Sequence, residues 1–220
     1  MSRTPQVRIS SDFWENTRFE NSGQANPGKD YREWKESIVK HFITPNVRDK
    51  TFLDLGVGHG RWASYVVGWA NRSILVDHDI SCIDFCRNRF GRDPYIQYIT
   101  NTGYDLRAIH SQSVDFIWAF DLFTNSAALT AYIPEMSRVL TLGGRMAIHV
   151  CDQSMDPLRN LNNFEVEFVS GWGDGFSLNN SEKIVTLKNN AAPVGVSQPG
   201  RWIQPIDLRK VKSTEIPASL

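Results

Sequence analysis

Three glycines at alternate positions limit the folds open to this chain. They are Gly56, Gly58 and Gly60, in the stretch TFLDLGVGHGRWASY of residues 51–65. Glycines this dense cost backbone entropy, so they indicate a turn whose backbone other residues adopt poorly. An apolar run typical of a strand precedes the turn, and a segment typical of a helix follows it. Such a turn lets a ligand approach the backbone closely.

The pattern after this turn alternates between strands and helices. The segments RSILVDHD, YIQYIT, VDFIWAF and GGRMAIHVC are short apolar runs, typical of strands buried on both faces. The segments RWASYVVGWA, SCIDFCRNRF and ALTAYIPEMSRVL are typical of helices, and Ser81 is expected to cap the second of them. This alternation predicts an α/β fold: a doubly wound, mostly parallel, Rossmann-like sheet with helices on both faces.

The two ends of the chain differ from this middle part. Residues 1–30 are polar and broken by proline and glycine, and the helical stripe that follows them is expected to end at Pro45. Two strands without a full helix between them follow Cys151, which predicts a C-terminal antiparallel strand. We therefore expect an N-terminal arm and helix over 1–44 that could act as a lid, a main domain over 45–190, and an extended tail over 191–220.

Composition excludes several classes of function. Lys plus Arg equals Asp plus Glu, 24 each, so no overall field draws the protein to nucleic acid or to an anionic membrane. The first ten residues lack the apolar core of a signal peptide, and no apolar run reaches about 18 residues, so a cytoplasmic location is expected. Three cysteines without a spaced framework favour reduced, packed thiols over disulfides or a zinc site.

The spacing of the glycines separates two classes of cofactor. Nicotinamide enzymes need G-x-G-x-x-G, and the third glycine position here is Arg61. The observed pattern is D-x-G-x-G-x-G, with Asp54 two residues before the first glycine. LDLGVGHGRW resembles the first motif of class I S-adenosylmethionine-dependent methyltransferases. The resemblance implies that the loop wraps the amino acid end of S-adenosylmethionine and that Asp54 supports its ammonium group.

Later strand ends extend this resemblance over residues 48–150. The second strand ends in LVDHDIS, where Asp77 and Asp79 compete for the ribose hydroxyls, and the family's D-x-S pattern favours Asp79. The third strand runs into NTGYDL, where Thr102 stands at the position of an acid that usually contacts adenine. The resemblance thus implies a cofactor site made of Asp54, Gly56, Gly58, Gly60, Asp79, Thr102, Gly103 and Phe120.

The fourth and fifth strands resemble a bacterial subgroup whose members often methylate hydroxyl groups of sugars or other small molecules. SVDFIWAFDLFTN and EMSRVLTLGGRMAIHV are similar to its DFIWSFDVFVH and RVLKPGGxxxIHH stretches. Asn125 replaces one histidine of the subgroup, and only His149 of the histidine pair is present. The resemblance therefore implies methyl transfer from S-adenosylmethionine to a small-molecule hydroxyl.

Polar residues at these strand ends are the candidates for catalysis. A hydroxyl acceptor needs a base to remove its proton. Asp121 and His149 follow two central strands, and we predict that both lie beside the transferred methyl, with His149 as the base because its ordinary pKa is near 6.5. Asp121 with Asp152 and Gln153 could instead hold a divalent metal, but we favour a site without metal.

Several alternatives stay open at this point. The enzyme could be an N-methyltransferase, or could act on protein or nucleic acid, although neutral charge and the absence of a D/N-P-P-[YFW] signature count against nucleic acid. The departures at Asn125 and Val150 are also compatible with a non-catalytic cofactor-binding homologue. We expect a small-molecule substrate, no nucleic acid and no membrane as partners, and the chain could form homo-oligomers.

Overall fold

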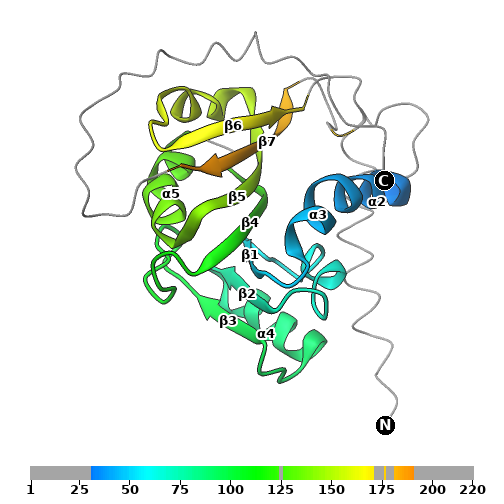
Figure 1. Cartoon of the computed structure of the whole chain (residues 1–220). Helices are drawn as coiled ribbons and strands as arrows, with labels where there is room; N and C mark the ends of the chain where they lie inside the picture. The colour runs from blue at the N-terminus through cyan, green and yellow to red at the C-terminus, as the bar shows by residue number, and fades with distance from the viewer. Residues whose placement is uncertain (1–30, 124–125, 171–175, 177–180, 191–220) are drawn as a thin grey trace.

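The computed structural model describes residues 31–123, 126–170, 176 and 181–190. One seven-stranded sheet in the order β3-β2-β1-β4-β5-β7-β6 crosses the molecule (Figure 1). Its strands are β1 (Thr51–Leu55), β2 (Arg72–Asp77), β3 (Ile96–Thr100), β4 (Val114–Phe123), β5 (Leu140–Cys151), β6 (Phe164–Val169) and β7 (Glu182–Asn189).

The directions of the strands match the predicted fold class. The pairs β1–β2, β1–β4, β2–β3 and β4–β5 are parallel, whereas β7 is antiparallel to both β5 and β6. The chain reverses its order at β1, where β2 and β4 lie on either side. In an open parallel sheet, this point at the carboxyl ends of the strands is where ligands bind.

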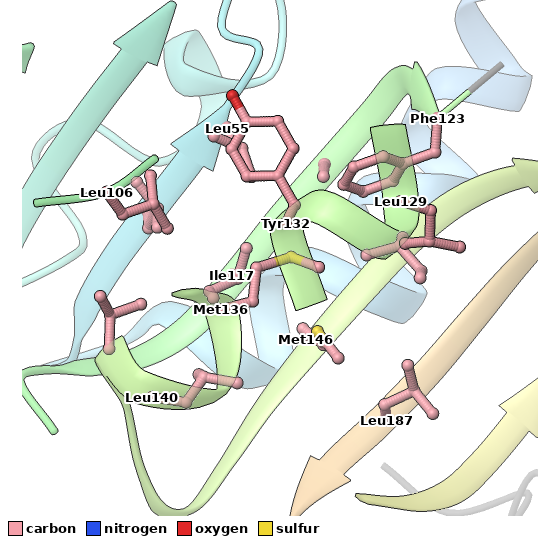
Figure 2. Packing of buried hydrophobic residues seen from close by; sticks show 14 of the residues in the cluster. Leu55, Leu106, Ile117, Phe123, Leu129, Tyr132, Met136, Leu140, Met146 and Leu187 are labelled. Carbon is pink, nitrogen blue, oxygen red and sulfur yellow. The ribbon is translucent and has the colours of Figure 1, made fainter. Parts of the chain in front are cut away.

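Helices cover both faces of the sheet, as expected (Figure 1). Helix α5 (Ser126–Val139) packs on one face, where Tyr132 and Met136 share a buried cluster with Ile117 and Met146 (Figure 2). The other face carries helix α4 (Ile80–Phe90) over β2 and an N-terminal helical segment over β1 and β4. Burying apolar surface on both faces is what makes the short apolar strands stable.

The N-terminal helical segment is longer than predicted. It comprises α2 (Tyr31–Ile38), the π-helical turn η1 (Val39–Ile43) and α3 (Thr44–Val47). The expectation that Pro45 ends the helix is wrong, because Pro45 lies in the first turn of α3, where its missing N–H costs nothing. The wider turn before it lets the Thr44 N–H donate to the Val39 carbonyl, so the chain stays helical up to Val47.

The prediction of a helix over residues 61–70 is also wrong. The segment contains only the 3-10 turn η2 (Ala63–Tyr65), followed by further turns. Gly68 adopts φ +98°, a left-handed conformation that no α-helix contains. The apolar side chains that suggested a helix are still buried, since Trp62, Ala63 and Val66 pack under α2 and α4.

Two other parts of the chain complete this description. The C-terminal strands β6 and β7 follow the short 3-10 turns η3 (Asp152–Ser154) and η4 (Asp156–Asn160). The arm at 1–30 and the tail at 191–220 lie outside the described residues. Among the helices that are described, none is both long enough and apolar enough to span a membrane.

Candidate functional site

The glycine turn after β1 adopts a backbone that requires glycine. Gly56, Gly58 and Gly60 have φ values of +77°, +52° and +75°, in the left-handed region. A Cβ on Gly60 would lie 2.7 Å from the Phe90 ring and 3.2 Å from the Cys86 sulfur, so this glycine lets α4 pack against the loop. A Cβ on Gly58 would meet nothing within 4 Å. Gly58 therefore presents bare backbone to open space.

A cavity of about 440 Å³ opens beside this bare backbone. It lies at the carboxyl ends of the strands, and its wall comes from the glycine turn, the start of α4 and the end of β4. Five of the predicted site residues line it: Gly56, Gly58, Asp79, Phe120 and Asp121. Sequence reasoning assigned no role in the site to Arg61, Trp62 or Arg89, which also line it.

Asp54 lies under the glycine turn and is almost fully buried, with 1% of its surface exposed. Its pKa is raised to about 8, mainly by burial; a hydrogen bond from the Ala63 backbone lowers the pKa in part, and the nearby Asp77 carboxylate raises it. Its Oδ2 atom has no hydrogen-bond partner among the residues that the structure describes. A buried carboxylate oxygen without a partner is costly, and a cationic group close by would offset that cost.

The two acids at the end of β2 have different tasks. Asp77 is buried and braces the glycine turn: its Oδ2 accepts from the Gly58 N–H at 2.8 Å and its Oδ1 from the Asp79 N–H at 3.0 Å. Asp79 is exposed and lines the cavity, so it is the acid that a ligand can reach. This placement agrees with the choice of Asp79 over Asp77, although the ribose contact itself stays a prediction.

Asp79 also begins helix α4. Its Oδ1 atom accepts a hydrogen bond from the Ser81 N–H at 2.8 Å, which makes Asp79 the N-cap. The expectation that Ser81 caps the helix is therefore wrong. The Ser81 hydroxyl and N–H stabilise the ionised carboxylate, so the pKa of Asp79 is lowered. An ionised carboxylate with one oxygen held by the cap is a suitable acceptor for ligand hydroxyls.

The predicted adenine contacts lie outside the cavity wall. The Thr102 hydroxyl donates to the Asp105 carboxylate, which lowers the pKa of Asp105. Gly103 has φ +93°, and its N–H donates to the Asn101 side chain at 3.0 Å. An acid, Asp105, thus lies beside Thr102, and sequence reasoning did not consider it. The roles of Thr102 and Gly103 stay predictions.

Asp121 is the acid at the end of β4. Its φ of +63° is rare for a residue other than glycine, and it lies where the β4–β5 register shifts between Ala119 and Phe123. A bulge of this kind redirects a side chain, and here the carboxylate lies in the cavity wall. Its Oδ2 is 3.8 Å from the Arg61 guanidinium, and its Oδ1 is 3.2 Å from His149 Nδ1.

His149 lies behind Asp121 and does not line the cavity. Its ring stacks on Phe120 at 4.1 Å and 10°, and its Nε2 is 3.6 Å from the Glu182 carboxylate. Burial lowers the pKa of His149, but the nearby carboxylates of Asp121 and Glu182 raise it by more, and the net shift is upward. The structure thus brings the two predicted catalytic residues together and adds Glu182, which sequence reasoning missed.

The polar residues considered for a metal do not converge on Asp121. Asp152 is exposed and pairs with Lys183 at 3.3 Å. Within the described ranges, no group of three or more His, Cys, Asp or Glu side chains could hold a metal ion. Asn125, which replaces a histidine of the resembling subgroup, lies outside the described residues.

Aromatic side chains close the cavity on the side of the N-terminal helix. Trp62 and Phe120 line the cavity with ring centroids 5.0 Å apart, and Trp34 of α2 packs edge-on against both. The Trp34 Nε1–H donates to the Phe176 carbonyl at 3.1 Å. Residues of the N-terminal segment therefore support the cavity wall from behind, and Trp34 itself is buried.

The central part of the chain matches one model in the comparison with protein families. Residues 53–148 match the model described as a methyltransferase domain. This range begins in β1, contains the glycine turn and the cavity wall, and ends one residue before His149. A search of curated proteins finds no match to this sequence.

Solved structures share the fold at low sequence identity. An S-adenosylmethionine-dependent methyltransferase from Mesorhizobium loti has a TM-score of 0.57 at 12% identity, covering 72% of this chain and 97% of that one. Phosphoethanolamine N-methyltransferase 1 from Haemonchus contortus, with S-adenosylhomocysteine bound, has 0.61 at 15% identity, covering 90% of this chain and 52% of that one. An rRNA methylase from Streptococcus thermophilus has 0.53 at 15% identity, covering 66% of this chain and 90% of that one.

These findings confirm the predicted fold class and support a methyltransferase enzyme with S-adenosylmethionine as its cofactor. The local geometry fits that cofactor, because the glycine turn exposes backbone at Gly58 and Asp54 holds a buried carboxylate oxygen without a partner. The acceptor is not determined, since the similar folds include an N-methyltransferase and an rRNA methylase.

Proposed function

We propose that this S-adenosylmethionine-dependent methyltransferase transfers the methyl group to a hydroxyl of a small molecule. The observation that carries the proposal is the position of Asp121. Its carboxylate shares one cavity with the glycine turn, and His149 backs it at 3.2 Å. A hydroxyl acceptor must lose a proton, and a carboxylate with a histidine behind it can take that proton up.

The cofactor site in this proposal consists of the predicted residues. The bare backbone at Gly58 receives the amino acid end of the cofactor, Asp54 supports its ammonium group, and Asp79 binds the ribose hydroxyls. Thr102 and Gly103 are assigned to the adenine, as the resemblance implies. Phe120 and Trp62 provide apolar wall beside the position of the transferred methyl, which keeps water away from it.

Asp121 and His149 then divide the work of the base. When bound, S-adenosylmethionine would supply an electrophilic methyl group to the acceptor oxygen, and its sulfur would keep the electron pair of the broken carbon–sulfur bond. Asp121 accepts the hydrogen bond of the acceptor hydroxyl and fixes the direction of attack. The Asp121–His149 pair takes up the hydroxyl proton. His149 acts through Asp121 here, because its own ring lies behind the cavity wall.

The size and charge of the site support a small acceptor. The cavity of about 440 Å³ lies in the range typical of small-molecule sites, and the whole chain carries no net charge that would attract a polyanion. A cytoplasmic location and a capacity to form homo-oligomers remain part of the proposal. Asp121 could also hold an amine, and the experiment below treats that outcome separately.

Two measurements test the proposal. Isothermal calorimetry should show that the chain binds S-adenosylhomocysteine and does not bind NAD. Tritiated S-adenosylmethionine should then label the small-molecule fraction of a cell extract, and the labelled product should be a methyl ether. Label in the RNA or protein fraction, or in a methylated amine, would contradict the acceptor class while leaving the cofactor assignment intact. Binding of NAD in place of S-adenosylhomocysteine would contradict both.

A further inference from the structure

Glu182 meets His149 through the pairing of β5 with β7. Glu182 is the first residue of β7 and lies opposite Cys151, two residues beyond His149 on β5. Residues two apart on a strand point to the same face, so the Glu182 side chain can reach the His149 ring. The Oε2 atom of Glu182 lies 3.6 Å from His149 Nε2.

The His149 ring is held on three sides. Asp121 Oδ1 lies 3.2 Å from its Nδ1, and Glu182 Oε2 lies 3.6 Å from its Nε2. The Phe120 ring stacks against its face with the ring centroids 4.1 Å apart. A neutral imidazole has one N–H and one lone pair, so it can satisfy only one of two flanking carboxylates. The imidazolium has an N–H for each of them. This arrangement therefore favours the protonated ring.

Other charged groups lie around this cluster. Arg61 of the glycine turn approaches Asp121 from the cavity side at 3.8 Å. Lys183, the next residue of β7, pairs with Asp152 of η3 at 3.3 Å. The negative charges of Asp121 and Glu182 balance the positive charges of Arg61 and a protonated His149. The cluster can therefore hold one proton on the ring without excess charge.

We propose that Glu182 is a positioning residue, which holds the His149 ring against Asp121 and sets how strongly the Asp121–His149 pair binds a proton. This inference rests on the proposed function, in which that pair takes up the proton of the acceptor. Burial lowers the pKa of His149, and the carboxylates of Asp121 and Glu182 outweigh that effect. A pair with a raised proton affinity is a stronger base once it is deprotonated.

Loss of the Glu182 charge should therefore act on His149 in a definite direction. Glu182→Gln removes one of the two carboxylates that favour the imidazolium, so His149 should lose its proton at lower pH than in the wild type. Glu182→Asp keeps the charge and should retain most of the raised proton affinity. Glu165→Gln is the matched control, because Glu165 lies exposed on the neighbouring β6 and accepts a hydrogen bond from the Asn190 side chain.

Nuclear magnetic resonance of the full chain with ¹³C-labelled histidine measures this titration directly. We expect the midpoint of the His149 signal, assigned with His149→Gln, to fall in Glu182→Gln and to stay near the wild-type value in Glu182→Asp and Glu165→Gln. An unchanged midpoint in Glu182→Gln, or an equal fall in Glu165→Gln, would overturn the proposal. Binding of S-adenosylhomocysteine by each variant reports whether the site is folded.

A second measurement needs no variant. In the wild type, ¹⁵N shifts followed over a pH series should show that His149 keeps both ring nitrogens protonated to higher pH than free histidine does. A ring that loses its second N–H at the pH of free histidine or below would overturn the proposal even if Glu182→Gln failed to fold.

The pH dependence of methyl transfer separates this inference from the proposed function. With a hydroxyl acceptor in hand, the rising limb of the rate in Glu182→Gln should move to lower pH, and its plateau should fall roughly three- to tenfold because the base is weaker. If the His149 titration shifts as expected in Glu182→Gln but the wild type methylates no hydroxyl, the proposed function is wrong and this inference stands. If the titration does not shift but the wild type does methylate hydroxyls, this inference is wrong and the proposed function stands.

Discussion

Replacing Gly60 by alanine tests why the glycine turn has its sequence. Gly60 has φ +75°, a conformation that costs an L-residue about 1–2 kcal/mol. The new Cβ would lie 2.7 Å from the ring of Phe90 and 3.2 Å from the sulfur of Cys86. The Phe90 ring is half-buried at the end of α4 and can shift, whereas Cys86 is fully buried and cannot.

The expected loss of stability combines these contributions. Overpacking against a buried neighbour costs about 1–3 kcal/mol. Alanine restricts the unfolded chain and returns about 0.4–1 kcal/mol. We therefore expect Gly60→Ala to lower the free energy of unfolding by about 2–4 kcal/mol, and each kcal/mol should lower the melting temperature by about 2–4 °C in a chain of this size.

Gly58→Ala is the matched control, because it shares the left-handed backbone without the contact. Its φ is +52°, and its Cβ would meet nothing within 4 Å. It should lower the free energy of unfolding by only about 1 kcal/mol. Its methyl group would instead enter the open space beside the cavity, so the affinity for S-adenosylhomocysteine should fall roughly tenfold or more.

Urea unfolding and calorimetry of both variants give the assay. We expect opposite patterns: Gly60→Ala loses more stability, and Gly58→Ala loses affinity out of proportion to its stability. Equal loss of stability in the two variants would show that the contact with α4 is unimportant. Wild-type affinity in Gly58→Ala would show that the ligand does not approach the backbone at this glycine.

Three further predictions concern single acids and the histidine of the site. Asp79→Ala should weaken binding of S-adenosylhomocysteine roughly 10- to 150-fold in calorimetry, because it removes a charged contact, and Asp77→Ala should mainly lower the unfolding free energy because Asp77 braces the glycine turn. The ligand-free chain should lose stability as pH rises from about 4 towards 8, because Asp54 has a folded pKa of about 8 and must bind a proton when the chain folds in this range. Asp54→Asn should flatten this dependence of stability on pH, measured by urea unfolding at several pH values. An unchanged slope would refute the raised pKa. His149→Ala should lower turnover on the true acceptor roughly 10²–10⁴-fold with nearly unchanged cofactor affinity, whereas His110→Ala, an exposed control, should leave turnover unchanged.

Local patterns in the sequence were sufficient to predict the fold class and the position of the glycine turn. Alternating strand and helix patterns are local signals, and so is the glycine spacing, which needs only its neighbours to be interpreted. The same local signals were less reliable for element ends. Gly68 interrupted an apolar pattern that looked helical, and Asp79 took the capping position expected of Ser81.

Tertiary structure decided which polar groups meet. Asp121, His149 and Glu182 come from three strands, and no spacing in the sequence relates them. The left-handed bulge at Asp121 directs its carboxylate into the cavity wall, and the register of β7 on β5 brings Glu182 to His149. A shift of that register by one residue would point Glu182 to the opposite face of the sheet. Strand register depends on contacts between distant parts of the chain, so local patterns do not contain it.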